Sequence, residues 1–296
     1  MTTRNKTPFK SARALLAGRV AVIATMHRKE QAIAPLLEST FGVKTRVPSD
    51  FDTDSFGTFT REIKRPADQL TTARLKADAA LKLTGETLAI ASEGSFGPHP
   101  QLPVIACDRE LVLLLDQQQH FEIVGEAVST ETNYRSQIIQ SVEEALTFAQ
   151  SVGFPDHGVV VMSASSHGPM QVITKGITMA ADLVEAVALA LERSPAKKAH
   201  IETDMRALYN PTRMRVIASA TQDLIQTIGQ LCPACGCPGF SIVQRQPGLP
   251  CGLCGAPTEL TRSVLYRCQR CQFQQDSQPP AALQFADPAY CPHCNP

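Results

Sequence analysis

Four Cys-x-x-Cys pairs near the C-terminal end constrain the fold of this chain more than any other feature. They account for eight of the ten cysteines, and a ninth, Cys237, lies among them. So short a segment buries little apolar surface, and metal binding commonly supplies much of the folding free energy of such small lobes. The body before Leu231 holds a single cysteine, a distribution that indicates metal ligands more than a disulfide framework.

The spacing of these thiols favours zinc. Zn²⁺ prefers four soft donors in a tetrahedron, and the two sulfurs of one Cys-x-x-Cys turn converge on one ion. We expect two structural zinc ions, each held by pairs that are neighbours in sequence. One ion would be bound by Cys232, Cys235, Cys251 and Cys254, and the other by Cys268, Cys271, Cys291 and Cys294. Interleaved or nested pairing stays open, as do redox dithiols and an iron–sulfur cluster.

The residues before the cysteines alternate strand-like and helix-like segments, which is typical of a layered α/β fold. Arg19–Thr25 is predicted to be a buried strand, and Arg65–Leu83 has the clearest helical periodicity. We predict further strands at 43–47, 87–91, 110–116, 121–128, 159–162 and 170–174, and further helices at 30–40, 136–151, 178–192 and 211–230. We expect an α/β body with a mixed sheet over residues 1–230, followed by two zinc ribbons over residues 231–296.

The charge distribution argues against nucleic acid and membrane as default partners. The formal net charge is zero, and the cysteine-rich segment carries four arginines, three acids and no lysine. Such a segment lacks the basic footprint that phosphate backbones select. Near the N-terminus, Arg19 interrupts the apolar stretch, so that the run Val20–Ala24 is too short for a signal peptide. We expect a soluble, cytoplasmic protein.

The first polar motif, Thr25-Met-His-Arg-Lys-Glu30, follows a predicted buried strand and opens a predicted helix. Such a turn directs free backbone N–H groups and the helix dipole at one point, which favours an anion. Lys29 adds charge, while Thr25 and His27 add hydrogen-bonding groups. The alternative is that Thr25 only caps the helix and that the basic side chains are solvated.

The second motif, Ala91-Ser-Glu-Gly-Ser-Phe-Gly97, follows the predicted strand at 87–91. Its small residues allow close backbone approach, and Glu93 at the end of a strand could hold a magnesium ion. The alternative is a glycine-containing turn with an exposed acid. On the helix between these motifs, Arg74 and Lys76 are interpreted as part of a solvated face.

The third motif, Glu202–Met214 (ETDMRALYNPTRM), combines carboxylates and arginines with Asn210-Pro211, a helix-start signal. Arg206 and Arg213 could grip a phosphate bidentately. Alternatively, these charges form a structural ion-pair network that fastens the body to the cysteine tail.

Two resemblances follow from these motifs. The order of a Thr-x-x-x-Lys turn (Thr25 to Lys29), a TARLKADAAL helix and the Glu93-Gly94 turn resembles the inosine/xanthosine triphosphate pyrophosphatase superfamily. That resemblance implies triphosphate binding at the first turn, and magnesium binding and water activation at the second. Met26 stands where that family has asparagine, with His27 as a stand-in. The chain is also similar to an uncharacterised bacterial family of unknown function, over the Thr25–Glu30 motif, Phe56–Pro66, Glu202–Met214 and the cysteines.

Two functional hypotheses result. In the first, the chain is a magnesium-dependent nucleotide or phosphoester hydrolase, with Glu93 and His27 as catalytic residues and with phosphate bound by Thr25, His27, Lys29, Arg206 and Arg213. In the second, it is a non-catalytic nucleotide sensor or interaction protein that docks a partner protein or RNA through the zinc ribbons. Either way, the expected cofactors are two structural zinc ions, with magnesium added in the first hypothesis.

Overall fold

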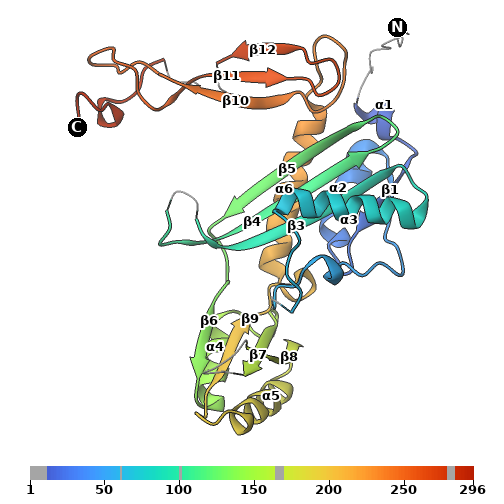
Figure 1. The fold of residues 1–296 in the computed structure, drawn as a ribbon, viewed down its shortest axis with the longest axis vertical. Coiled ribbons are helices and arrows are strands. Elements are labelled where there is room, and N and C mark those ends of the chain that lie inside the picture. The colour runs from blue at the N-terminus through green and yellow to red at the C-terminus, as the bar shows by residue number, and fades with distance from the viewer. Residues whose placement is uncertain (1–11, 61, 100–101, 164–169, 279–283) are drawn as a thin grey trace.

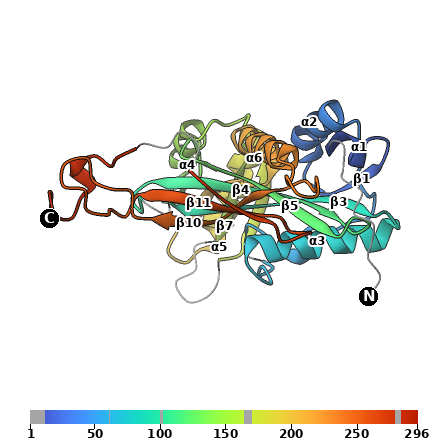
Figure 2. The same cartoon turned by 90° about the horizontal axis from the view of Figure 1, so that it is seen from above.

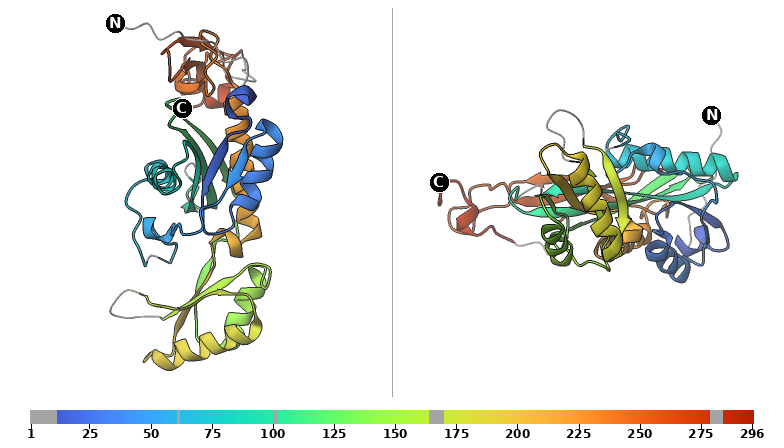
Figure 3. Two further views of the ribbon diagram at one scale, coloured as in Figure 1. Left: turned by 90° about the vertical axis from the view of Figure 1, so that its right-hand side faces the viewer. Right: turned by 90° about the horizontal axis from the view of Figure 1, so that it is seen from below.

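A computed structural model describes residues 12–60, 62–99, 102–163, 170–278 and 284–296. The chain forms three parts arranged along the long axis of the molecule (Figure 1, Figure 3). A five-stranded sheet with helices lies in the middle, a smaller sheet with two helices lies at one end, and the cysteine-rich module lies at the other.

The central sheet is mixed, as predicted. Its strand order is β2-β1-β3-β4-β5, with β1 parallel to β2 and β3, and with β4 antiparallel to both β3 and β5. The residues of β1 (VAVIA) are apolar and mostly buried because helices cover both faces of the sheet. The bounds are β1 Val20–Ala24, β2 Lys44–Arg46, β3 Leu88–Pro98, β4 Ala106–Asp116 and β5 Phe121–Ser129.

Helices cover the two faces of this sheet unequally. Helix α3 (Gln69–Thr84) packs on one face, while α2 (Glu30–Phe41) and α6 (Pro211–Gly229) pack on the other, with the short α1 (Ala12–Leu16) beside them (Figure 2). Each long helix begins or ends where the sequence supplies a cap. The Asp68 carboxylate accepts from Thr71 N–H at the start of α3, and Gly42 ends α2 in the left-handed conformation.

The smaller sheet is antiparallel, with strand order β6-β9-β7-β8. Helices α4 (Val142–Ser151) and α5 (Ala180–Arg193) pack on one of its faces and share an apolar core with it. Its other face turns Val160 and Glu202 towards a cavity at the junction with the central sheet. The strands are β6 Ser136–Ile139, β7 Val159–Ser163, β8 Val172–Ile177 and β9 Ala199–Thr203.

Helix α6 leads from this junction to the cysteine-rich module. The module is a three-stranded antiparallel sheet of β10 (Ser241–Pro247), β11 (Thr261–Arg267) and β12 (Gln274–Ser277). Several of its cysteines belong to the same apolar core as α2, α6 and the central sheet. The observed architecture therefore confirms the predicted class, a mixed α/β body with a small cysteine-rich module.

Three local predictions are wrong. Residues 136–141, predicted as the start of a helix, form β6 and the cap of α4, because the Ser141 hydroxyl accepts from Glu144 N–H there. Residues 91–97, predicted as a turn, continue β3 and pair with β4 along its whole length. Strand β9 was not predicted. Within the described ranges, every helix is too short or too polar to span a bilayer.

Candidate anion cavity and metal centres

A cavity of about 120 Å³ lies where the central sheet meets the smaller one. Its wall is formed by the turn after β1, the segment between β2 and α3, strands β3 and β8, and the start of α6. All the noncysteine residues predicted as candidates line it: Thr25, His27, Lys29, Glu93, Arg206 and Arg213. The fold thus brings together residues from three separate motifs, although their roles stay predictions.

The turn after β1 exposes donors at the start of α2. The Thr25 hydroxyl accepts from His27 N–H at 3.1 Å, so Thr25 shapes the turn and does not cap α2, whose N-cap residue is Lys29. Arg28 adopts a left-handed φ of 59°. Among the described residues, no acceptor is found for the backbone N–H groups of Arg28, Lys29 and Glu30. The start of α2 is therefore able to receive an anion.

Lys29 is a buried cation in this wall. Its Nζ donates to the carbonyl of Ser92 at 3.0 Å, and among the described residues no carboxylate is hydrogen-bonded to it. Burial, with a smaller effect of the charge of Arg213, lowers the pKa of its ammonium group to about 7, although the nearby carboxylates of Glu110 and Glu93 oppose the shift. A bound anion would stabilise the charged form of this side chain.

Arg213 is the most deeply buried charge of the cavity, with 1% of its surface exposed. Its Nε donates to Glu110 Oε1 at 2.6 Å and its Nη1 donates to the carbonyl of Met205 at 2.6 Å, while its Nη2 has no hydrogen-bond partner. The guanidinium lies over the rings of Phe59 and Phe96, at 4.6 and 5.3 Å from their centroids. A buried N–H group without an acceptor is costly, and a ligand in the cavity would remove that cost.

Gly94 makes room for this arrangement. A Cβ atom at Gly94 would lie 2.2 Å from Glu110 Oε1 and 2.6 Å from Arg213 Nη2. The Glu110 carboxylate has a second buried carboxylate, Asp108, as its neighbour, and burial together with the charge of Glu110 raises the pKa of Asp108 to about 8. Two buried carboxyl groups therefore lie near Arg213, and one of them, Asp108, has a raised pKa.

Glu93 does not lie in an exposed acidic turn, as predicted, but in the middle of β3. β3 pairs with β4 before and after this residue, and Glu93 is only 5% exposed. Its carboxylate forms ion pairs with Lys76 of α3 and with Arg65, the latter at 3.1 Å. Lys76, interpreted from sequence as a solvated residue, is buried as the partner of Glu93. With both oxygens facing cations, Glu93 does not fit a magnesium ligand in this structure.

The remaining candidates also have defined partners. His27 Nε2 lies 2.8 Å from Asp54 Oδ1, and Arg206 Nη2 donates to Asp204 Oδ2 at 2.7 Å. Arg206 and Arg213 thus pair within the body, with Asp204 and with Glu110 of β4, and do not fasten the tail as the alternative interpretation required. Both side chains face the cavity.

Sequence reasoning missed three wall residues, Asp54, Lys76 and Lys175, whereas it left Arg65 open as a phosphate ligand or as part of an ion-pair network. The spacing on α3 held one signal, since Lys76 lies on the same helical face as buried Thr72, Ala73, Ala77 and Ala80. A lysine in an alanine stripe indicates a buried partner. Asp54 and Lys175 carried no comparable signal. Arg61, within the Phe56–Pro66 segment, lies outside the described residues.

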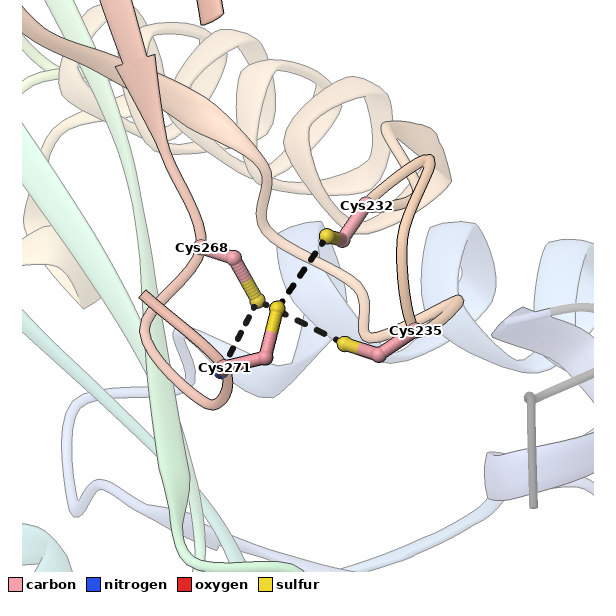
Figure 4. A group of neighbouring side chains, drawn as sticks. All are labelled: Cys232, Cys235, Cys268 and Cys271. Atoms are coloured by element: carbon pink, nitrogen blue, oxygen red, sulfur yellow. Dashed lines mark hydrogen bonds between the residues drawn. The ribbon is translucent and has the colours of Figure 1, made fainter. Parts of the chain in front are cut away.

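The eight predicted metal ligands form two groups of four sulfurs. Cys232, Cys235, Cys268 and Cys271 converge in the first (Figure 4), and Cys251, Cys254, Cys291 and Cys294 in the second. In the first group, the Sγ atoms of Cys232 and Cys271, and those of Cys235 and Cys268, are 3.7 Å apart. In the second group, the distances are 3.9 Å between Cys251 and Cys294 and 3.6 Å between Cys254 and Cys291. Four thiolates at about 2.3 Å from one ion would be about 3.8 Å apart. Both groups therefore fit a tetrahedral metal ion such as zinc.

The predicted pairing of neighbouring Cys-x-x-Cys turns is wrong, because the first turn joins the third and the second joins the fourth. The β-hairpin explains this. Antiparallel pairing of β10 with β11 sets Ser241 opposite Arg267, which brings the turns that flank the hairpin together. The second turn lies at the far end of the hairpin, where Cys251 bridges to Ala286, next to the fourth turn. Leftover Cys237 is fully buried beside the first group.

Comparisons with known proteins give a family but no activity. A search of curated proteins found no match. Protein VC0702 from Vibrio cholerae, a solved crystal structure, aligns with a TM-score of 0.31 and 11% identity over 70% of this chain and 93% of that chain. Neither comparison supports the resemblance to the pyrophosphatase superfamily. A family model described as "Domain of unknown function (DUF6671)" matches residues 76–296, more than half of the chain. The chain belongs to this family of unknown function.

Proposed function

We propose that this protein binds a phosphorylated small molecule of the nucleotide class, with the phosphate groups in the anion cavity. The observation that carries this proposal is Arg213, a buried guanidinium in the cavity wall whose Nη2 has no hydrogen-bond partner among the described residues. Lys29, without a carboxylate hydrogen-bonded to it, and the free N–H groups at the start of α2 supply further donors on the same wall. Such donors match the oxygens of a phosphate.

A second cavity supports a nucleotide over a simple phosphate. It measures about 210 Å³ and shares Thr58, Phe59, Thr60 and Arg65 with the first. Three aromatic rings follow one another along it, with 5.2 Å between the centroids of Phe59 and Phe96 and 5.8 Å between those of Phe96 and Tyr134. A flat, weakly polar group attached to a phosphate would find aromatic surface here.

The test is calorimetric titration of the full chain with pyrophosphate, with nucleoside triphosphates and with the corresponding nucleosides. We expect binding of the phosphorylated compounds, tighter for the triphosphates than for pyrophosphate. Lys29→Met should abolish this binding, while Lys44→Met, at an exposed lysine of β2, should leave it unchanged. Absence of binding to every phosphorylated compound would refute the proposal.

Hydrolysis of the bound ligand is a second candidate, favoured by the His27–Asp54 contact in the cavity wall. A histidine whose ring is held by a carboxylate is a common general base. In this hypothesis His27 would take a proton from a water molecule that attacks the phosphate. No step is assigned to magnesium, because Glu93 is paired with Lys76 and Arg65. Release of phosphate or pyrophosphate from a triphosphate panel, lost in His27→Ala, would support it.

We further propose that both groups of four cysteines hold zinc and that the ions are structural. Four sulfurs complete each coordination sphere, so that no position is open for a substrate. Metal analysis of the purified protein should give two zinc ions per chain. One ion, or another metal, would contradict this assignment.

A further inference from the structure

The cavity already contains a negative charge of its own. Asp54 lies in a one-turn 3-10 helix (Asp54–Phe56) within the segment that joins β2 to α3, and its carboxylate is part of the cavity wall. Its Oδ1 atom lies 2.8 Å from Nε2 of His27, the imidazole of the turn after β1. The side chain is 26% exposed, so it reaches the cavity from the solvent side.

The surroundings of Asp54 keep it ionised. The hydrogen bond from His27 is the main cause that lowers the pKa of this carboxyl group, and the positive charges of Lys175 and Arg206 lower it further. These three groups come from different parts of the chain and all line the same cavity. The position that Asp54 occupies is therefore one where the protein stabilises an anion.

Asp54 also differs from the other carboxylates around the cavity. Glu93, Glu110 and Asp204 are each less than a tenth exposed, and each pairs with an arginine or a lysine. Asp54 is instead paired with a histidine and lies on a one-turn helix. Displacing Asp54 would break one side-chain hydrogen bond, whereas displacing any of the others would leave a buried charge unpaired.

We infer that Asp54 is an internal substitute for the ligand: it occupies part of the anion site in the free protein, and the bound phosphate displaces it from His27. This inference rests on the proposed binding function, and it excludes the hydrolysis hypothesis, which needs Asp54 to hold the His27 ring in the complex. It makes Asp54 a residue that weakens binding and selects for strongly charged ligands. A monoanion gains little by replacing one carboxylate, whereas a pyrophosphate group, with several charges, can replace Asp54 at His27 and also face the positive charges of Lys175 and Arg206, which keep their partners Glu62 and Asp204.

The test compares three full-length, zinc-loaded proteins by calorimetric titration with pyrophosphate in buffer without added divalent cations. Asp54→Asn keeps the shape of the side chain and removes its charge. We expect its Kd to fall at least about tenfold, because one unit of repulsion within a few ångströms of the ligand is lost. Asp50→Asn removes one charge from the same segment at an exposed residue outside the cavity wall, whose carboxylate accepts from the Ser49 hydroxyl, and should leave Kd unchanged. Circular dichroism would establish that the variants are folded.

The outcomes separate the two proposals. If the wild type binds pyrophosphate and Asp54→Asn binds it equally or more weakly, the inference is overturned but the proposed function is kept. Asp54 would then act to position His27. Binding by Asp54→Asn alone would support the inference strongly. If neither protein binds pyrophosphate, the inference fails, and the proposed function then stands only if a nucleoside triphosphate binds. Asp54→Ser, which removes the charge and shortens the side chain, should repeat the effect of Asp54→Asn if charge is the cause.

Discussion

The two metal centres differ in how they are embedded, and their ligands should therefore differ in importance. In the first centre, Cys232, Cys235 and Cys268 are 2%, 5% and 1% exposed and belong to the main apolar core, together with Ile123 and Ile228. In the second centre, Cys254 is exposed, and among the described residues none of its ligands belongs to that core. The end of the module that carries it projects away from the central sheet (Figure 1).

The matched variants are Cys235→Ser and Cys254→Ser, each of which alters the second cysteine of a Cys-x-x-Cys turn. Structural zinc is worth about 10–16 kcal/mol in small metal-binding peptides, while a whole domain is stable by about 5–15 kcal/mol. If Cys235→Ser costs even half of the zinc-binding free energy, the loss is comparable with the stability of the body. We expect this variant to be insoluble or to melt far below the wild type.

Cys254→Ser should instead leave a folded body with one zinc ion per chain. Its thermal unfolding, followed by circular dichroism, should stay within a few degrees of the wild type, since only the outer centre loses its ion. Zinc content by mass spectrometry provides the parallel measurement. Equal destabilisation by the two substitutions would refute the reasoning, because it would show that the outer centre is as tightly coupled to the core as the inner one.

Three further outcomes follow from the cavity. Pyrophosphate affinity should decrease as pH rises above about 7, because Lys29, whose pKa burial lowers to about 7, then loses its charge; a flat calorimetric profile from pH 6 to 8 would contradict this. Lys29→Met should raise the free energy of unfolding on the order of 1–3 kcal/mol in urea titrations below pH 7, since it removes a buried charge. Gly94→Ala should destabilise by about 2–4 kcal/mol, because its Cβ would overlap the Glu110–Arg213 pair, whereas Gly97→Ala, with open space around it, should have little effect.

The sign of the Lys29 effect can be worked out from the same pKa. The unfolded chain binds this proton up to about pH 10.5, whereas the folded chain releases it near pH 7. Between these values the unfolded state holds more protons, so the contribution of Lys29 to stability rises with pH across this window and is least favourable below it. Ligand affinity and stability therefore change in opposite directions with pH at this one residue.

Local sequence signals were enough to predict where several helices begin and end. Asn210-Pro211 predicted the start of α6, where the Asn210 side chain accepts from Arg213 N–H. The helices predicted over 30–40 and 65–83 end close to Gly42 and Gly85, which adopt the left-handed conformation after α2 and α3. The Thr25–Glu30 turn was placed correctly between a buried strand and a helix, because the apolar run and the polar cluster adjoin directly.

The features that the sequence did not predict depend on contacts between residues that are far apart along the chain. The Gly and Ser residues of segment 91–97 predict a turn. In the structure the segment is a strand, and Gly94 leaves room for the side chains of Glu110 and Arg213 beside it. The partners of Glu93 and Asp54 come from distant parts of the chain, and spacing alone does not show which charges will meet. The pairing of cysteine turns depends in the same way on the register of one hairpin.

Helix α6 has a consequence for the thermodynamics of the whole molecule. It carries Arg213 in its first turn and leads, three residues after its end, to Cys232 of the inner metal centre. Gly125 lets its backbone lie against β5, where a Cβ would come within 2.2 Å of Leu224 N, so the helix has little freedom to slide. A rigid connection of about 28 Å thus joins the two proposed binding sites. By linkage, any factor by which the metal tightens phosphate binding is the factor by which phosphate tightens metal binding.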